Sequence, residues 1–522
     1  MTDVEKIPGG LQDGSGAYTG VVKNIARNTS VMLLQYSLTW GTSFLAMIFI
    51  PRYLGPVEYG RLFLATSVIS LFRVFIEYGG SYLVAKEVAR NPRNSGQILV
   101  DAVAFRLVFA MAAFGGVLLT AETGGYPSET NTLLLIFGVG LFGHALYTVL
   151  FAVFQGHEKM KYTALSAVVN GFFGNVLSVV AVILWHQAWI IAVIGVSASL
   201  IEIGLMVFFA RRITVSFPRI RWEGARRQLK AGLPYFMFAI FSALYARIDA
   251  VMLSKMTSDV VVGWFGGARK LFEALALFPF IFSTAVYPVL SRLWKQQGDV
   301  HRRATQKSLE FMVLLGVPLS IGVCAFARLP IQIFFGLEAY GPTVPVLQIL
   351  SPGIVFLFID MVLGTALLAS DRQRAQSILA LVMIPLNVGM NFIFIPYFHD
   401  MYGNGGMGAA VATVLTEVMI MMVMIKLVPR GVLEGFRMSV VYKSLAAGGA
   451  MAGGIVLLLW LEVPTVVSAA LSVVIFHQML FLLRTFEPEE ERALKSLLTP
   501  KGLLAAVRSL REGKKPPGEG DS

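Results

Sequence analysis

Long apolar runs dominate the sequence and restrict it to one class of protein. About fourteen runs of about 20 or more mostly apolar residues, bounded by charges, Gly or Pro, follow one another along the 522 residues. A helix needs about 20 such residues to cross a hydrocarbon core of about 30 Å. We therefore expect an all-α polytopic membrane protein with about 14 transmembrane helices. The runs cover residues 29–50, 60–83, 97–121, 132–154, 162–184, 188–210, 232–254, 262–289, 306–327, 342–368, 375–396, 406–428, 440–461 and 464–484.

The composition agrees with this class. Hydrophobic residues make up 56% of the chain and charged residues only 14%, whereas about 25% of a soluble domain is charged. This excludes a large soluble enzyme and a disordered chain. A single Cys excludes an intramolecular disulfide.

The distribution of basic residues predicts the orientation. With the N-terminus in the cytoplasm, 34 of the 43 Lys and Arg fall in cytoplasmic segments and four, Arg52, Arg61, Lys255 and Arg328, in external ones. Basic residues in short loops resist translocation. We therefore expect a multi-pass protein of the cell inner membrane with both termini cytoplasmic. The net charge of +12 then reflects topology and contact with anionic membrane lipids, not nucleic-acid binding.

One long connection divides the first twelve spans into six and six. Across it, Tyr59-Gly60 followed by Ala65 matches Val262-Gly263 followed by Ala268, and Asn170 and Asn175 match Asn387 and Asn391. Such self-similarity is typical of transporters built from two bundles. We expect a cytoplasmic N-terminal tail (1–28), an N-lobe of spans 1 to 6 (29–210), a cytoplasmic linker (211–231), a C-lobe of spans 7 to 12 (232–428), appended spans 13 and 14 (429–484) and a cytoplasmic tail (485–522).

Ionisable residues occur within these runs, although each costs about 3 kcal/mol or more on a lipid-facing helix. They are expected to face the bundle interior or a wet cavity. Pairing within the bundle, such as Arg73 with Glu77 or Arg247 or Arg269 with Asp249, is one interpretation. The basic cavity candidates are Arg73, Arg106, Arg247, Arg269 and Lys270, and the coupling-ion or pairing candidates are Glu77, Glu202, Asp249, Asp360 and Glu417.

The arginines favour a second interpretation, a wet cavity with net positive charge. Arg does not lose its proton in proteins, so pairing alone would require a carboxylate against each one. A cationic cavity between two lobes is suited to an anionic group, and the planar guanidinium binds phosphate with two parallel hydrogen bonds. The sequence therefore predicts a phosphate-bearing substrate.

Motifs of several enzyme classes are absent from the sequence. It contains no G-x-x-x-x-G-K-[ST], H-E-x-x-H or G-x-S-x-G pattern, and no external loop exceeds about 15 residues. We expect a transporter and not an enzyme, with no cofactor and no metal. The six His lie near the ends of runs, where solvated interface roles are favoured over metal ligation.

Several segments resemble one transporter family. Residues 52–60 (RYLGPVEYG), 232–234 (GLP) with 248–249 (ID), and 263–268 (GWFGGA) ending at 287–291 (YPVLS) resemble the polysaccharide transporter branch of the multidrug/oligosaccharidyl-lipid/polysaccharide exporter superfamily. Residues 391–396 (NFIFIP) and 405–410 (GGMGAA) are similar to the segment joining spans eleven and twelve in that branch. Where relatives often carry Asp near the inner end of span two, this chain has Glu77.

The resemblance implies a flippase for lipid-linked oligosaccharide carried on undecaprenyl pyrophosphate, serving lipopolysaccharide or exopolysaccharide export. Members move the head group by alternating access of the two lobes and leave the prenyl tail in lipid. Interaction with polysaccharide assembly proteins is a further expectation. The alternatives are a drug/cation antiporter of the same superfamily, which should favour acidic cavity residues, and a membrane glycan polymerase or ligase, which should carry a catalytic external loop.

Overall fold

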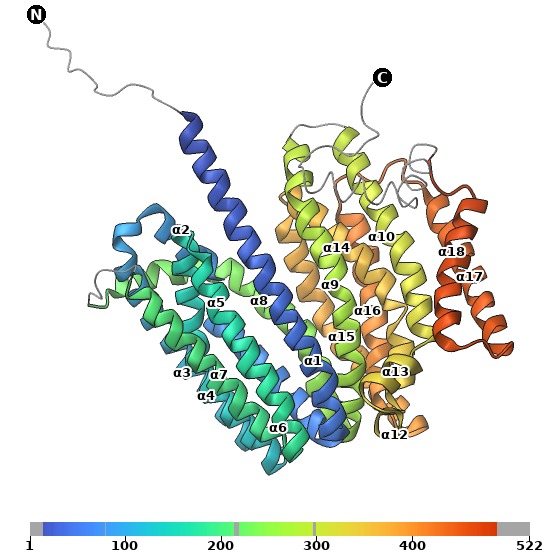
Figure 1. Cartoon of the computed structure of the whole chain (residues 1–522), viewed down its shortest axis with the longest axis horizontal. Coiled ribbons are helices and arrows are strands. Elements are labelled where there is room, and N and C mark those ends of the chain that lie inside the picture. The colour runs from blue at the N-terminus through green and yellow to red at the C-terminus, as the bar shows by residue number, and fades with distance from the viewer. Residues whose placement is uncertain (1–13, 79, 213–218, 296–298, 488–522) are drawn as a thin grey trace, which may run out of the picture. The chain divides into compact units, whose positions relative to one another are not determined.

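A computed structural model describes residues 14–78, 80–212, 219–295 and 299–487. All regular structure in these ranges is helical (Figure 1). The first half of the chain forms α1 (Gly14–Ile76), α2 (Gly80–Arg90), a 3-10 turn (Pro92–Asn94), α3 (Ser95–Thr123), α4 (Ser128–Gly156), α5 (Met160–Gly171), a π-helical turn (Phe172–Val176), α6 (Leu177–Trp185) and α7 (Ala188–Ala210).

The second half contains longer helices with short interruptions. It forms α8 (Trp222–Met256), α9 (Asp259–Lys295), α10 (Asp299–Ala325), α11 (Arg328–Phe334), α12 (Leu337–Tyr340), α13 (Thr343–Leu350), α14 (Gly353–Ala369), α15 (Gln373–Tyr402), α16 (Gly405–Leu427), α17 (Met438–Trp460) and α18 (Thr465–Leu482).

These helices confirm the all-α polytopic membrane class. By length and composition, eleven of them in the described residues could cross a membrane, or twelve if α13 and α14, which meet at 42°, form one bent span. One of the eleven, Leu34–Ile76, is 43 residues long and covers two of the predicted runs. The run at 232–254 lies in α8, which is not among the eleven. The count of about fourteen spans remains a prediction.

α1 is interrupted at Gly55, between the first two predicted runs. Gly55 has φ 73° and ψ 169°, and Pro51 and Pro56 flank it. Glycine accepts a positive φ without the Cβ clash that other residues meet, and each proline removes a backbone N–H donor. This local chemistry breaks the helix where the sequence predicts an external turn.

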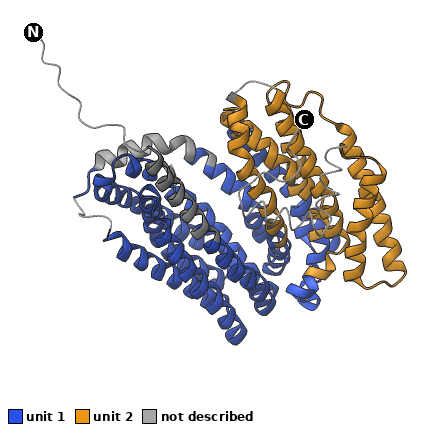
Figure 2. Cartoon of the chain, turned by 45° about the horizontal axis from the view of Figure 1, so that its top comes forward, with its two compact units in different colours: residues 1–270, 331–346, 377–412 blue, residues 271–330, 347–376, 413–522 orange. Residues whose placement is uncertain are grey.

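Contacts divide the chain into two units (Figure 2). Unit 1 contains residues 1–270, 331–346 and 377–412, and unit 2 contains residues 271–330, 347–376 and 413–522. The boundary of unit 1 runs through the predicted C-lobe, and the division into two six-helix lobes with two appended helices stays a prediction.

Each unit has a core of buried side chains. In unit 1, α3, α4 and α7 pack closely, with Val149, Phe154 and Met206 almost fully buried. In unit 2, α10 packs against α14 and α17, and α17 against α18, around Met451 and Phe476. These apolar cores hold the polar groups described below at fixed positions.

Candidate functional site

A cluster of charged residues lies where α1, α3 and α4 meet in unit 1. The Oε1 atom of Glu77, just after α1, is 2.9 Å from Nε2 of His144 on α4. Arg73 of α1 and Arg106 of α3 both interact electrostatically with the Glu77 carboxylate. The structure therefore brings three of the predicted site residues together and adds His144.

The side chains of the cluster differ in their exposure. Arg106 is 1% exposed, and the side chain of His144 is 16% exposed, whereas Arg73 and Glu77 are exposed. Two guanidinium groups face one carboxylate, and Arg keeps its charge even when buried. The positive charge of the guanidinium groups would attract an anionic group next to Arg73.

His144 corrects one interpretation of the sequence. It lies in the middle of α4, not at a solvated helix end, and its ring binds Glu77. His301 on α10 is also buried, at 4% exposure. In the described ranges no group of three or more His, Cys, Asp or Glu is arranged to hold a metal ion.

Two buried carboxylates of unit 1 accept hydrogen bonds from asparagines. Nδ2 of Asn170, on α5, donates to Oε2 of Glu202, on α7, at 2.6 Å. Nδ2 of Asn391, on α15, donates to Oδ1 of Asp249, on α8, at 2.7 Å and to Oδ1 of Asn387 at 3.0 Å. These are asparagines that the repeat comparison singled out, and a coupling-ion role for either acid stays a prediction.

The other basic candidates lie on α8 and α9 of unit 1. Arg247 is half-buried on α8, which packs against both α1 and α3. Arg269 is half-buried and Lys270 exposed on α9. Packing thus places Arg247 on a helix that adjoins those of Arg73 and Arg106, and the convergence of all five basic side chains on one chamber remains a prediction.

Asp360 and Glu417 lie in unit 2. Asp360 is on α14 and Glu417 on α16, each 7% exposed, and the two carboxyl groups interact with each other. Both predicted acids are therefore in the interior of unit 2, whereas the five basic candidates belong to unit 1.

Close helix contact at Gly60 is a feature that sequence reasoning missed. A Cβ added to Gly60 would overlap the carbonyl oxygen of Asp259, and one added to Gly263 would overlap the carbonyl oxygen of Pro56. Small residues permit such backbone approach between membrane helices. The repeat comparison matches Gly60 with Gly263, but a single sequence gives no sign that the two glycines meet.

Arg61 forms ion pairs beside this contact. Its guanidinium nitrogens lie 2.7 Å from a carboxylate oxygen of Glu58 and 2.9 Å from one of Asp259. A carboxylate oxygen of Glu129 lies 3.7 Å away. Asp259 is the first residue of α9 and Glu129 lies in the first turn of α4, so one arginine joins α1, α4 and α9. Together with the Gly60–Gly263 contact, these ion pairs form what we call the Arg61 seal.

An aromatic cluster lies beyond the Glu77 end of α1. Tyr78 stacks on Phe236 of α8 with 4.7 Å between ring centroids and contacts Phe105 and Phe109 of α3. Phe75 also contacts Phe236, at 5.5 Å. α1 and α8 are therefore held together by aromatic packing at one end of the charged cluster, while the Arg61 seal joins α1 to α9 at the other.

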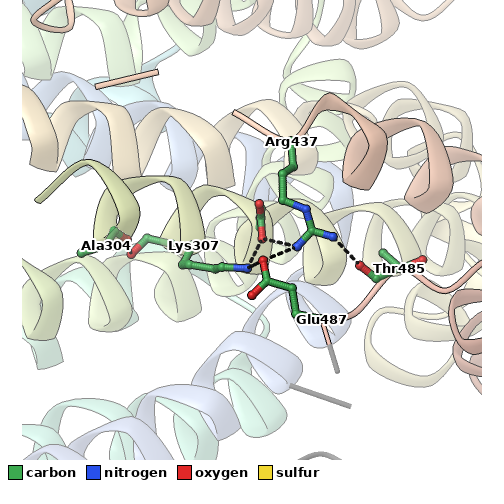
Figure 3. Close-up of polar contacts among 7 residues, drawn as sticks. Ala304, Lys307, Arg437, Thr485 and Glu487 are labelled. Atoms are coloured by element: carbon green, nitrogen blue, oxygen red, sulfur yellow. Dashed lines mark hydrogen bonds and ion pairs between the residues drawn. The ribbon is translucent and has the colours of Figure 1, made fainter. Parts of the chain in front are cut away.

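An ion-pair network in unit 2 ties the end of α18 to α10 and α17 (Figure 3). Lys307 of α10 contacts Glu310 at 3.1 Å and Glu487 at 2.9 Å, and Arg437 donates to Glu487 at 2.8 Å. The hydrogen bond from Lys307 and the positive charge around it lower the pKa of Glu487 below its ordinary value. We interpret this network as structural.

The lowered pKa of Glu487 predicts a small pH-dependent stabilisation. Its contribution is complete above the unfolded pKa, near 4.3, and is lost as the pH falls through the folded-state pKa. Because the side chain is 45% exposed, we expect Glu487→Gln to lower the free energy of unfolding by at most about 1 kcal/mol at pH 7. Thermal unfolding of both proteins in detergent should show the difference shrinking below pH 4.3, and a difference that grows on acidification would contradict the assignment.

Comparisons with known proteins agree with the helical architecture. Residues 25–294 match a family model described as polysaccharide biosynthesis protein, and residues 218–481 match one described as lipid II flippase MurJ. A putative O-antigen transporter of Escherichia coli (strain K12) is 22% identical over 371 residues, covering 68% of this chain and 85% of the relative.

Solved transporters share the fold. A structure of the lipid II flippase MurJ in an inward closed conformation superposes with a TM-score of 0.69 at 15% identity, covering 87% of this chain and 99% of the other. An inward-facing multidrug resistance transporter of the MATE family gives a TM-score of 0.64 at 14% identity, covering 79% and 100%.

Many helices long and apolar enough to cross a membrane, together with the match to a flippase family model and the similarity to transporters, define a multi-pass membrane transporter of the flippase type and not an enzyme. The chain belongs to the polysaccharide biosynthesis protein family, in the polysaccharide transporter branch of the multidrug/oligosaccharidyl-lipid/polysaccharide exporter superfamily.

Proposed function

We propose that the protein translocates a lipid-linked oligosaccharide, carried on undecaprenyl pyrophosphate, from the cytoplasmic to the outer leaflet of the inner membrane for polysaccharide export. The observation that carries the proposal is the cluster in unit 1 in which Arg73, Arg106 and His144 surround the Glu77 carboxylate. A diphosphate offers negative charge and acceptor oxygens, both of which guanidinium groups bind.

The chemistry of arginine supports a phosphate-bearing head group. A guanidinium presents its donors in a planar fork that matches phosphate oxygens, and hydrogen bonds to charged groups contribute about 1.5 to 3 kcal/mol each. Arg73 is exposed and able to reach a ligand, while buried Arg106 adds positive potential behind it. Arg247, Arg269 and Lys270 extend the positive charge along α8 and α9 in the proposed chamber.

Alternating access explains the contacts on either side of the charged cluster. In the proposed orientation the Arg61 seal closes the outer end, and the cluster of Tyr78, Phe105, Phe109 and Phe236 narrows the inner end. Opening one contact while the other stays closed would expose the head group to one side of the membrane at a time, with the prenyl tail left in lipid.

The same proposal accounts for location and partners. Both termini would be cytoplasmic, the tails would contact anionic lipid head groups, and polysaccharide assembly proteins would supply and receive the glycan. The putative O-antigen transporter of Escherichia coli and the capsular polysaccharide biosynthesis protein CapF of Staphylococcus aureus, which is 19% identical over 387 residues, have names consistent with this pathway class.

Leaflet analysis of the lipid-linked intermediate tests the function. Cells that lack the protein should retain complete oligosaccharide on the cytoplasmic leaflet, and mass spectrometry should find its chain length unchanged. Restored export on re-expression completes the test. Glycans of altered length would indicate a polymerase or ligase, and normal export accompanied by loss of cationic dye efflux would indicate a drug antiporter.

The Arg61 seal gives a further prediction. Arg61→Glu would place four carboxylates together where one arginine now joins three, so we expect the outer contact to open. If the repulsion destabilises the closed state by about 1.4 kcal/mol or more, export should fall at least about tenfold. Arg328→Glu, an exposed arginine that is also predicted to be external, is the matched control. Export at the wild-type rate in Arg61→Glu, at equal protein level, would remove the seal from the mechanism.

A further inference from the structure

Asp360 and Glu417 form a carboxyl pair in the interior of unit 2. The two groups come from α14 and α16, both are nine-tenths buried, and their carboxyl groups lie close enough to interact directly. Two ionised carboxylates side by side in a low-dielectric interior repel each other strongly. The pair therefore requires a cation or a proton.

Among the residues that the structure describes, the surroundings of Asp360 supply no other hydrogen-bond donor. Within the described part of the chain, neither Oδ1 nor Oδ2 of Asp360 accepts a hydrogen bond, although both atoms are fully buried. Oε1 of Gln376, whose side chain lies over Gly364 one turn further along α14, is likewise buried without a donor in those ranges. Ionised carboxylates are acceptors only, so a hydrogen bond between Asp360 and Glu417 requires a bound proton.

We propose that Asp360 and Glu417 bind one proton between them, as a carboxyl–carboxylate pair joined by an O–H···O hydrogen bond. A shared proton removes the repulsion and gives one Asp360 oxygen a partner at the same time. Metal binding is the weaker explanation, because the described residues contain no group of three or more metal-ligating side chains here.

The charged groups on the neighbouring helices define the surroundings of the pair. α14 packs against α10, against α16 at Gly353 and Val414, and against α9 through Phe278 and Phe358. On α10, Lys307 and Glu310 pair with each other at 3.1 Å. Arg372, which follows α14, donates to the carbonyl oxygen of Leu427 at 2.7 Å. The remaining charged residues on these helix segments in unit 2 are Glu273, Arg292, Lys295, Asp299, Arg302, Arg303 and Lys426.

A proton site at this position would couple transport to the proton gradient, and this link rests on the proposed function. The pair lies at the middle of α14 and of α16. Uptake of a proton from one side and its release to the other would then accompany the change of access. The binding of the proton itself can be measured without any glycan.

Infrared spectroscopy of the purified full-length protein in lipid nanodiscs tests the proton site. At pH 7.5 the wild type should show the carbonyl stretch of a protonated buried carboxyl, and Asp360→Asn/Glu417→Gln should lose it. The single substitutions should each reduce or abolish the band. Both amides match the original side chains in shape, so no unpaired charge is left buried. Glu310→Gln is the matched control, because Glu310 is a buried carboxylate that has Lys307 as a cationic partner.

Three outcomes decide the proposal. Loss of the band in the double variant, with its retention in Glu310→Gln, supports the shared proton. A band that persists in the double variant overturns the shared proton. A wild-type band that disappears when sodium chloride replaces potassium chloride also overturns it, in favour of bound sodium. If the band is lost and glycan export in cells remains at the wild-type level, the proton site stands and its coupling to transport is overturned.

Discussion

Arg73→Ala is expected to reduce glycan export by about 10- to 100-fold at unchanged protein level. Arg73 is the exposed arginine of the charged cluster, so its removal should cost the substrate one charge-assisted hydrogen bond, of about 1.5 to 3 kcal/mol, without disturbing the core. Export is measured as surface polysaccharide per cell, with the amount of membrane-inserted protein determined in parallel.

Two variants make this result specific. Arg73→Lys keeps the charge but loses the planar fork, and we expect it to retain part of the activity. Arg90→Ala removes an exposed arginine from the end of α2, outside the cluster, and should export normally. Equal loss in Arg73→Ala and Arg90→Ala would show that net positive charge, and not a phosphate site, is the requirement.

Gly263→Ala is expected to shift the protein toward an outward-open state. The added methyl group would overlap the carbonyl oxygen of Pro56, which is a backbone atom of α1. Overpacking of this kind costs about 1 to 3 kcal/mol, so the closed population should fall about 5- to 150-fold relative to the open one. Export should fall with it, because the transport cycle needs both states.

Thiol labelling reports this shift directly. Cys324 is the single cysteine, so a Cys324→Ser background permits labelling at one introduced site. Ala65, which is fully buried about one and a half helical turns after Gly60, becomes the probe as Ala65→Cys. An impermeant reagent added outside should label it faster when Gly263→Ala is present. Gly115→Ala, where an added Cβ meets nothing within 4 Å, should leave the labelling rate unchanged. No change with Gly263→Ala would show that the glycine contact is static.

Much of the helical architecture could be predicted because membranes impose a simple length rule. The predicted run at 188–210 has the same bounds as α7, and the run at 406–428 differs from α16 by one residue at each end. Hydropathy alone determines such ends. The predicted runs at 29–50 and 60–83 likewise lie on either side of the break at Gly55 in α1.

The candidate site was predictable only as a set of residue types. A charged residue at membrane depth is expensive wherever it occurs, so Arg73, Glu77 and Arg106 were recognised without knowledge of their neighbours. Identifying their partners requires the packing of the helices, because the position of His144 opposite Glu77 depends on how α4 lies against α1. The pairing of Asn391 with Asp249 likewise joins residues 142 positions apart.

The close contact between Gly60 and Gly263 could not be predicted from the sequence. The internal repeat matches the two glycines with each other. Contact between them depends on how the helices pack, which hydropathy and repeat patterns in one sequence do not predict. The same holds for Arg61, whose partners Glu58, Glu129 and Asp259 come from three helices.

Aqueous accessibility of the arginine positions tests the central claim most directly. In the Cys324→Ser background, cysteines introduced singly at positions 73 and 247 are exposed to a water-soluble thiol reagent in proteoliposomes, with and without a lipid-linked oligosaccharide pyrophosphate. If a shared wet chamber binds the diphosphate, both positions react and the substrate slows both reactions. Unreactive thiols at both positions, or rates that the substrate leaves unchanged, would contradict the chamber and the substrate chemistry derived from it.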